Sequence, residues 1–317
     1  MRCLYCYKEL AHGEHDFHKA CSRKIFGKTE VPELPYTEAQ MPDLAKGLIK
    51  SRIAVPGVQA KLSLDIERSG KEEKHLPRFT IVGLWGSYIL KPPTDHFQFL
   101  PEVEDLTMHL ASIAGIQTVP HSLIRLKSGN LAYITKRIDR AKNNKLHMED
   151  MCQLTERMTE DKYKGSYEQI AKAIFKYAAN PGLDIINFYE QVVCSFLTGN
   201  ADMHLKNFSL LKNNTTGYEL APAYDMVATK LLMKEDEEDL ALMLNGKKRR
   251  LDRRDFDKAM LSASLSDDKS IQRLYLKFAK AIPKWLAFIE NSFIPADMKE
   301  DYRQLIIERA KRLQITV

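Results

Sequence analysis

The second half of the chain shows apolar residues at helical spacing in three segments, 166–178, 183–197 and 271–313. Ser166 stands where it can cap the first of these helices. The apolar positions read as core rather than as a cofactor site, and the chain beyond Arg140 is expected to be helical. These positions are Ile170, Ile174, Tyr177, Ile185, Phe188, Tyr189, Val192, Val193, Phe196, Leu197, Trp285, Leu286 and Ile289.

The first half shows short apolar runs that are typical of strands. Two strands are predicted at 79–82 and 87–91, and two more at 123–126 and 131–135, which flank the turn at 127–130 as a hairpin. An amphipathic helix precedes the hairpin, with apolar residues at Leu106, Leu110 and Ile113. This part of the chain is therefore expected to be mostly sheet with one helix.

A proline-rich segment, 31–42, precedes the sheet region and is interpreted as a linker or an extended crossing segment. Asp43 can cap a short helix that runs through Lys50. The loop at 53–64 then passes into alternating residues and contains one glycine, Gly57. As a phosphate-binding loop it is weak on its own, because one glycine allows little close approach of the backbone.

Length and composition describe an ordinary globular protein. The 317 residues can bury a large core and favour two lobes. A net charge of +6 fits an acidic ligand such as ATP, and it neither demands nor excludes nucleic acid. No apolar run approaches the ~20 residues of a membrane span. Cys3 and Cys6 lie where a signal peptide needs an apolar core, so we expect a cytoplasmic protein with no membrane contact.

Three of the five cysteines lie in the first 21 residues. The pairs Cys3-x-x-Cys6 and His18-x-x-Cys21 are separated by eleven residues and suit a tetrahedral zinc ion. With four protein ligands the ion would be structural. The alternative is a set of reduced thiols without metal. The other nearby histidines are His12 and His15, and Cys152 and Cys194 are interpreted as buried thiols.

The most informative stretch runs from Gly199 to Asn207 and places Asp202 and Asn207 in one loop with four residues between them. In protein kinases that spacing sets a catalytic aspartate against the substrate hydroxyl and an asparagine on a metal ion, and a later aspartate holds magnesium. Asp225, in an apolar stretch, supplies a later carboxylate, which is costly there unless it is paired or holds a metal. The alternative is that Asp202 caps a helix and Asn207 is a turn residue.

Lys91 ends an apolar strand, where it can reach the phosphates of ATP or can simply be solvated. Glu102 or Glu104, in the helix that follows, can pair with it. The charge runs at 235–239 and 247–254 are opposite in sign. We interpret them as a partly self-compensating surface, with docking of an acidic partner or nucleic acid as the alternative.

With these motifs together, the chain resembles the HipA family of bacterial serine/threonine kinases, which are toxins of toxin–antitoxin systems. It is most similar to the short HipT-like form, which lacks an N-terminal subdomain. The resemblance runs from about Ala54 to the C-terminus. The matching positions are Gly199, Asn200, Asp202, His204 and Asn207 in the loop, Tyr224 and Asp225, 89–91, Glu104, 136–140, 149–153 and 55–61.

The resemblance implies an α+β, two-lobed, protein-kinase-like fold with a mixed-sheet N-lobe at 29–140 and a helical C-lobe at 141–317. The zinc-knuckle-like segment that the cysteine and histidine spacing predicts lies ahead of the lobes, at 1–28. Asp202 would orient or deprotonate the target hydroxyl, with His204 and Asn207 in the same catalytic loop. Asn207 and Asp225 would bind Mg²⁺. The residues implied on the ATP side are Lys91, Glu104, Val55, Gly57, Gln59, Lys61, Lys136 and Ile138.

Two features depart from the family pattern. Family members often autophosphorylate a serine near the glycine loop, but Ala54 and Pro56 occupy those positions here. That autoinhibition is expected to be absent or to have moved to Ser51 or Ser63. The cysteine/histidine knuckle is also outside the pattern, and it can replace the missing subdomain or dock a separately encoded one.

The implied partners are a protein substrate such as an aminoacyl-tRNA synthetase, a HipB-like helix-turn-helix antitoxin and a small HipS-like protein, with DNA reached only through the antitoxin. Two alternatives stand beside the toxin kinase. One is a catalytically weak kinase-fold module that binds an antitoxin and contributes to DNA repression. The other is a small-molecule kinase, since a fold and its ATP machinery do not specify the acceptor.

Overall fold

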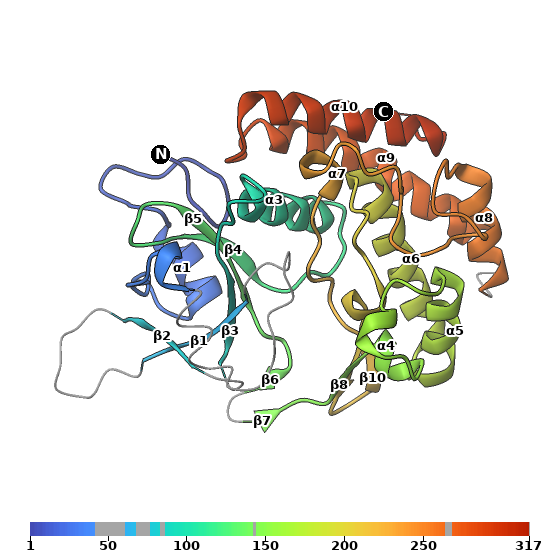
Figure 1. Ribbon diagram of the computed structural model, residues 1–317, viewed down its shortest axis with the longest axis horizontal. Coiled ribbons are helices and arrows are strands. Elements are labelled where there is room, and N and C mark those ends of the chain that lie inside the picture. The colour runs from blue at the N-terminus through green and yellow to red at the C-terminus, as the bar shows by residue number, and fades with distance from the viewer. Residues whose placement is uncertain (42–60, 68–76, 83–85, 142–143, 264–267, 317) are drawn as a thin grey trace. The chain divides into compact units, whose positions relative to one another are not determined.

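The computed structural model describes residues 1–41, 61–67, 77–82, 86–141, 144–263 and 268–316 (Figure 1). The chain divides into two compact units. Unit 1 comprises 1–105, 119–138 and 291–293, and unit 2 comprises 106–118, 139–290 and 294–317. The division expected from sequence is continuous along the chain, whereas these units interleave.

Unit 1 is built on a five-stranded antiparallel sheet with the order β2-β1-β3-β5-β4. The predicted hairpin is confirmed as β4 and β5, and the two strands predicted before it are confirmed as β2 and β3. Leu90 and Ile134 pair across the middle of the sheet, and both are fully buried. The strands are β1 Leu62–Ile66, β2 Phe79–Ile81, β3 Tyr88–Lys91, β4 His121–Arg125 and β5 Leu131–Lys136.

The N-terminal segment shares one apolar core with this sheet. Helix α1, Lys19–Phe26, places Phe26 against Phe79 and Tyr88, and a short 3-10 helix, η1, follows at Glu38–Gln40. Figure 1 shows α1 beside the strands. The short helix expected from Asp43 lies outside the described residues.

Helix α3, Leu100–Ile113, is the amphipathic helix predicted before the hairpin. Its residues Val103, Leu106 and Leu110 are fully buried. The first turns, through Asp105, belong to unit 1, and the remainder belongs to unit 2. In unit 2 the indole Nε1 of Trp285 donates to the carbonyl of Leu110 at 2.7 Å, which ties this part of α3 to the C-terminal helices.

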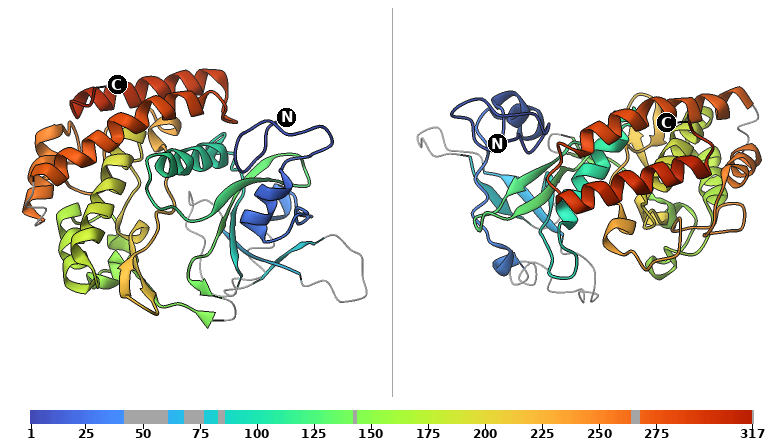
Figure 2. Two further views of the ribbon diagram at one scale, coloured as in Figure 1. Left: turned by 180° about the vertical axis from the view of Figure 1, so that it is seen from behind. Right: turned by 90° about the horizontal axis from the view of Figure 1, so that it is seen from above.

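Unit 2 is mainly helical, as predicted. Ser166 caps α5 through a hydrogen bond from the amide of Gln169, and α6 starts at Pro181 and ends before Gly199, which has φ +72°. Helix α10 runs beside α9 (Figure 2). The helices are α4 Met151–Leu154, α5 Tyr167–Tyr177, α6 Pro181–Thr198, α7 Thr229–Leu232, α8 Arg253–Ser262, α9 Asp268–Ile289 and α10 Ala296–Arg312, with 3-10 turns η2 Thr159–Asp161 and η3 Leu205–Asn207.

Unit 2 also contains strands that helical periodicity does not reveal. A three-stranded antiparallel sheet has the order β10-β9-β8, and β6 pairs with β7. These strands are only two to five residues long, too short to leave a pattern of alternation. Their bounds are β6 Arg140–Ala141, β7 Asn144–Lys145, β8 Met148–Asp150, β9 Ser209–Asn213 and β10 Gly217–Leu220.

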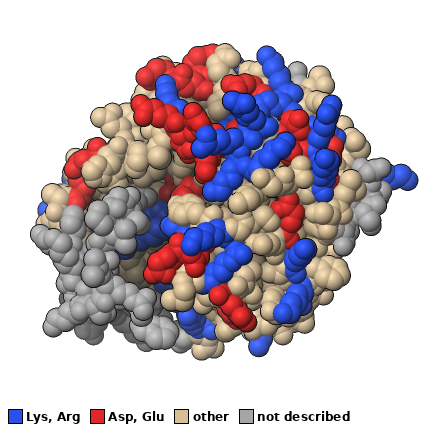
Figure 3. Space-filling view, turned by 45° about the vertical axis from the view of Figure 1, so that its right-hand side comes forward, with Lys and Arg blue, Asp and Glu red and all other residues tan. Residues whose placement is uncertain are grey.

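The two opposite charge runs in unit 2 pair with each other, which confirms the self-compensating interpretation. Arg249 pairs with Glu237, and Lys248 pairs with Glu238 at 3.4 Å. Figure 3 shows basic and acidic side chains interspersed on one face. Asp239 is the exception in its run, because it is buried and pairs with arginines of α10. None of the helices in the described ranges combines the length and the apolar character of a membrane span.

Candidate active site

The start of the loop after α6 is held in place by hydrogen bonds. Asn200, fully buried, accepts the amide of Asp202 on its Oδ1 at 3.1 Å. The amide of Ala201 donates to Oγ1 of Thr229 at 2.9 Å. The next helical turn, η3, has His204 as its N-cap, so Asp202 caps no helix and the alternative assignment for this residue is wrong. Its carboxylate is left to face other side chains.

Asn207 and Asp225 lie side by side in unit 2. Nδ2 of Asn207 donates to Oδ2 of Asp225 at 3.1 Å, while Oδ1 of Asn207 is buried and has no hydrogen-bond partner among the described residues. Asp225 has φ +60°, a strained conformation that persists only where the surroundings impose it and that clusters at functional sites. A buried unpaired amide oxygen beside a carboxylate is a donor set that suits Mg²⁺. These residues therefore fit the magnesium site that the sequence predicts.

His204 and Tyr163 flank the loop carboxylate. The Tyr163 hydroxyl donates to Oδ1 of Asp202 at 2.6 Å, and its ring packs edge-on against His204 with 4.9 Å between centroids. Burial lowers the pKa of His204 to about 4, although the charge of Asp202 acts in the opposite direction. The imidazole is consequently neutral at pH 7. Burial and the hydrogen bond to Asp202 raise the pKa of Tyr163 well above its ordinary value.

An ion pair holds the end of the loop that follows Asp202. Nζ of Lys206 contacts Oδ2 of Asp150 at 2.6 Å. Asp150 is also the N-cap of α4, where it forms a capping box with Gln153. The Tyr224 hydroxyl donates to the carbonyl of Lys206 at 3.0 Å. The motif at 149–153 thus supports the loop through Lys206.

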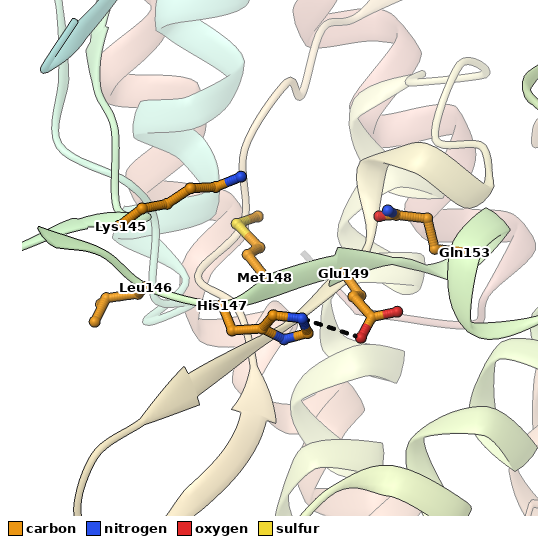
Figure 4. A pocket seen from close by; sticks show the side chains of 6 residues that line it. All are labelled: Lys145, Leu146, His147, Met148, Glu149 and Gln153. Atoms are coloured by element: carbon orange, nitrogen blue, oxygen red, sulfur yellow. Dashed lines mark ion pairs between the residues drawn. The ribbon is translucent and has the colours of Figure 1, made fainter. Parts of the chain in front are cut away.

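A pocket of about 430 Å³ lies beside the same motif (Figure 4). In it His147 and Glu149 point toward each other, with 3.5 Å between Nε2 and Oε1. The pocket is wet and open, since His147 is exposed and Glu149 is half-buried. Its lining residues are Lys145, Leu146, His147, Met148, Glu149 and Gln153. None of them is among the residues assigned to ATP from the sequence.

In unit 1, Lys91 at the end of β3 forms an ion pair with Glu104 of α3. Both side chains are almost completely buried, at 5% and 1% exposure. A buried pair of this kind is costly to desolvate, and its presence often marks a specific arrangement rather than a gain in stability. The pairing with Glu104, rather than with Glu102, is the one that the sequence match selects.

The other predicted ATP-side residues are less informative. Lys136 is exposed at the end of β5, and Ile138 is half-buried at the last position of that part of unit 1. Lys61 is exposed just before β1. The predictions for Val55, Gly57 and Gln59 lie outside the described residues, as do Ala54, Pro56 and Ser51.

The N-terminal cysteines and His18 converge in unit 1. One ligand atom from each of Cys3, Cys6, His18 and Cys21 lies within 4.8 Å of all the others. Nδ1 of His18 is 3.4 Å from Sγ of Cys6 and 3.7 Å from Sγ of Cys21. Tetrahedral zinc with three thiolates and an imidazole separates sulfur and nitrogen by about 3.6 Å. His18, rather than His12 or His15, is the histidine in this cluster.

The surroundings of the cluster favour a cation. Nε2 of His18 is 2.9 Å from the carbonyl of Glu9, a bond that leaves Nδ1 as the ligand atom. Burial, and then the charge of Cys3, raises the pKa of Cys21 to about 12. Burial acts in the same direction on Cys3, but backbone amides of His18, Cys6 and Tyr5 outweigh it and lower that pKa. Several thiolates therefore coexist here only with a compensating positive charge.

Sequence patterns missed several residues that hold these groups. Tyr163 gave no signal, because it lies 39 residues from Asp202 and on no predicted motif. Asp105 had one available signal, a carboxylate in the apolar stretch of α3, since such a group is usually paired. In the structure Tyr7 and His121 both contact Asp105.

The sequence matches a known family over most of its length. The HipA-like C-terminal domain matches residues 53–286, and the chain belongs to that family. A Haemophilus influenzae protein named "Putative kinase" is 31% identical over 212 residues, which cover 62% of this chain and 58% of that protein. The serine/threonine-protein kinase toxin HipA of Shewanella oneidensis is 26% identical, over 83% of this chain and 64% of that protein. The chain thus spans less than two thirds of the length of these relatives.

The fold is that of HipA. The structure of Shewanella oneidensis HipA in a complex with HipB and operator DNA superposes with a TM-score of 0.67 at 21% identity. The match covers 97% of this chain and 74% of that one. It confirms the α+β, HipA-like fold class expected from the sequence.

Proposed function

We propose that the chain is a serine/threonine protein kinase that uses ATP and Mg²⁺. The observation that carries the proposal is the contact between Asn207 and Asp225. It combines a buried amide oxygen that has no partner within the described part of the chain with an aspartate at positive φ, in the loop system that also presents Asp202. A metal–nucleotide site has a use for each of these features. Aspartate at positive φ also occurs in structural turns, so the buried amide oxygen is the feature that favours a metal. The kinase names of two relatives support the same class of activity.

In this reaction the γ-phosphoryl group moves from ATP to a serine or threonine oxygen. A new P–O bond forms at that oxygen, the bond to the β,γ-bridging oxygen breaks, and ADP leaves with its electron pair. Asp202 orients the hydroxyl and accepts its proton. Lys91, held by Glu104, contacts the ATP phosphates. Asn207 and Asp225 would hold Mg²⁺, which would supply positive charge to offset the charge of the phosphates.

We further propose that the kinase acts as the toxin of a HipA-type toxin–antitoxin system. Its substrate would be a translation component such as an aminoacyl-tRNA synthetase, and its partner a HipB-like helix-turn-helix antitoxin that carries the contact with DNA. The titles of the Shewanella relatives, a kinase toxin and a complex with HipB and operator DNA, support this role. Expression of the chain should arrest growth, and co-expression of the antitoxin from a neighbouring gene should relieve the arrest.

The N-terminal cluster is proposed to bind one structural zinc ion. Three thiols and one imidazole supply four ligands, which leaves no open position for a substrate or water. The ligand separations and the bond from His18 to Glu9 support this assignment. Metal analysis of the purified full chain should find about one zinc per chain, and Cys6→Ser should lower that content.

The test of kinase activity is phosphate transfer from labelled ATP with Mg²⁺ into a lysate of the host. The wild-type chain should label a protein band, which mass spectrometry then identifies. Asp202→Asn should abolish the band, while Asp301→Asn, which removes a carboxylate from a surface ion pair with Lys234, should leave it unchanged. Absence of any labelled protein although ATP binds would contradict the protein kinase and favour the antitoxin-binding module or the small-molecule kinase.

A further inference from the structure

The zinc cluster is connected to the ATP-binding ion pair by a chain of buried contacts within unit 1. Tyr7 directly follows Cys6, and its hydroxyl donates to Oδ2 of Asp105 at 2.8 Å. Asp105 is the neighbour of Glu104 in α3. Tyr7 is 2% exposed, and Asp105 is completely buried. A hydrogen bond to a buried carboxylate is among the stronger ones and expensive to lose.

The backbone of Tyr7 is set by the cluster itself. Its amide donates to the carbonyl of Cys3 at 2.9 Å, so the tyrosine ends a turn that carries Cys3 and Cys6. Its φ is +61°, which a bulky residue adopts only when the surroundings impose it. Ligation of Cys3 and Cys6 to one ion would hold this turn in place. The position of the Tyr7 hydroxyl therefore depends on the geometry of the cluster.

The carboxylate of Asp105 has a second partner that leads to Lys91. Nδ1 of His121 lies 2.7 Å from Oδ1 of Asp105. The imidazole stacks on the ring of Tyr133 with 6.0 Å between centroids. Nζ of Lys91 lies 5.4 Å from the centroid of the same ring. Asp105 is thus linked to both members of the Lys91–Glu104 pair. It is next to Glu104 in α3, and through His121 and Tyr133 it is linked to Lys91.

We propose that the N-terminal zinc cluster is a positioning element for this ion pair. Through Tyr7 and Asp105 it holds the first turns of α3, and with them Glu104, in the place where Glu104 meets Lys91. Tyr7, Asp105 and His121 are positioning residues and do not touch the nucleotide. The role of the pair in ATP binding rests on the proposed function, but the coupling of the cluster to α3 does not.

Hydrogen–deuterium exchange of the full chain tests the coupling without any assay of activity. Removal of the metal with a chelator should raise exchange in the peptide that covers 100–105, and Tyr7→Phe should do so with the metal still bound. The matched control is Tyr88→Phe, which loses a buried 3.1 Å bond to the carbonyl of Ile25 and should leave that peptide unchanged. Unchanged exchange at 100–105 in both the chelated protein and Tyr7→Phe would overturn the proposal.

Nucleotide affinity tests the consequence. Tyr7→Phe should weaken ATP binding about 3–10-fold, because only part of the lost hydrogen bond is expected to reach the ion pair, while zinc content stays at about one per chain. In a Glu104→Gln background the same substitution should have no further effect. Full, independent effects of the two substitutions would show that Tyr7 does not act through Glu104.

A second variant keeps the test open if Tyr7→Phe does not fold. Asp105→Asn preserves the shape of the side chain and removes the charge that both Tyr7 and His121 contact, so it should raise exchange at 100–105 in the same way. Failure of the wild-type chain to bind ATP would contradict the proposed function instead, and hydrogen exchange would still decide whether the cluster positions α3.

Discussion

The hydroxyl of Tyr163 donates a 2.6 Å hydrogen bond to the carboxylate oxygen Oδ1 of Asp202. The tyrosine is 42% exposed, so solvent and a substrate can both reach this contact. A serine or threonine hydroxyl that is to be activated by Asp202 must donate to the same carboxylate. In the proposed kinase Tyr163 therefore occupies one of the two carboxylate oxygens that could accept the hydroxyl of the acceptor.

Tyr163→Phe is expected to ease entry of the acceptor. The phenylalanine keeps the edge-on packing against His204 and releases one carboxylate oxygen. Because a hydrogen bond at a solvent-exposed side chain contributes about 1 kcal/mol, KM for the protein substrate should fall about 2–5-fold, with kcat changed less than about 2-fold. Steady-state phosphate transfer at saturating ATP measures both constants.

Tyr177→Phe is the matched control. Tyr177 is 40% exposed and has a lysine over its ring at 4.7 Å, as Tyr163 has one at 4.9 Å. It should leave both constants unchanged. A fall in kcat of about tenfold or more in Tyr163→Phe would mean that the tyrosine orients Asp202 rather than competing with the acceptor.

Asp225→Asn should disable the metal site while it preserves the fold. Asparagine tolerates positive φ about as well as aspartate does, so the backbone at φ +60° should not change. Loss of the carboxylate charge should lower the rate of phosphate transfer about 10²–10³-fold and raise the Mg²⁺ concentration needed for activity. A magnesium titration together with a thermal unfolding curve checks both statements.

Asp225→Ala distinguishes the effect of backbone strain at this position from the effect of losing the carboxylate. It also removes the charge, but alanine adopts φ > 0 less readily, so it should lower stability by about 1 kcal/mol more than Asp225→Asn does. Near wild-type transfer by folded Asp225→Asn would sink the assignment of this residue to the metal.

Much of the candidate site was visible in the sequence because its chemistry is local. Asp202 and Asn207 share one loop, and the two cysteine/histidine pairs can be recognised from their spacing in the sequence. The α5 cap at Ser166 and the hairpin of β4 and β5 follow from short-range rules. Each of these features is specified by residues close together in the chain.

The remainder depends on contacts between distant segments. Tyr163 reaches Asp202, and Tyr7 reaches Asp105 across 98 residues, through folding alone. The strands β8 and β9 were missed because pairing, rather than alternation, defines them. Asp239 belongs to an acidic run that looks solvated, yet the arginines of α10 keep its pKa low despite its burial. Local patterns carry no information about such partners.

The stability of the chain should fall as pH rises through the range set by Glu102. Burial, with a smaller effect of the Asp105 charge, raises the pKa of Glu102 to about 7, compared with 4.5 for a free side chain. Below pH 4.5 the group is protonated in both the folded and the unfolded chain. Between about pH 4.5 and 7 the unfolded chain releases its proton first, so the free energy of unfolding falls by up to about 1.4 kcal/mol per pH unit.

Glu102→Gln should remove this dependence. The variant should be more stable than the wild type at pH 8, by about 1–2 kcal/mol, and not more stable at pH 4.5. Calorimetry at the two pH values resolves the transition of unit 1. Glu300→Gln, which changes an exposed glutamate at the start of α10, should keep the wild-type pH dependence. If the stability of Glu102→Gln and of the wild type depended on pH in the same way, the raised pKa of Glu102 would be contradicted.

Gly199 joins α6 to the loop of Asp202, and alanine at this position should be costly in two ways. The backbone has φ +72°, and an added Cβ would lie 2.6 Å from Cδ2 of Leu305 and 3.1 Å from Cβ of Lys230. Strain at positive φ costs about 1 kcal/mol, and displacement of the neighbours adds to it, so Gly199→Ala should destabilise the chain by about 2–3 kcal/mol. Phosphate transfer should fall as well, because the displaced residue begins the catalytic loop.

Gly246→Ala isolates the backbone contribution, since Gly246 has φ +75° and an added Cβ there would meet no atom within 4 Å. It should cost only about 1 kcal/mol and leave transfer unchanged. Denaturant unfolding of both variants gives the difference, which is the cost of crowding Leu305 and Lys230. If the two variants were equally stable, Leu305 would have moved aside freely, and any loss of transfer in Gly199→Ala would then report the backbone of the loop rather than its packing.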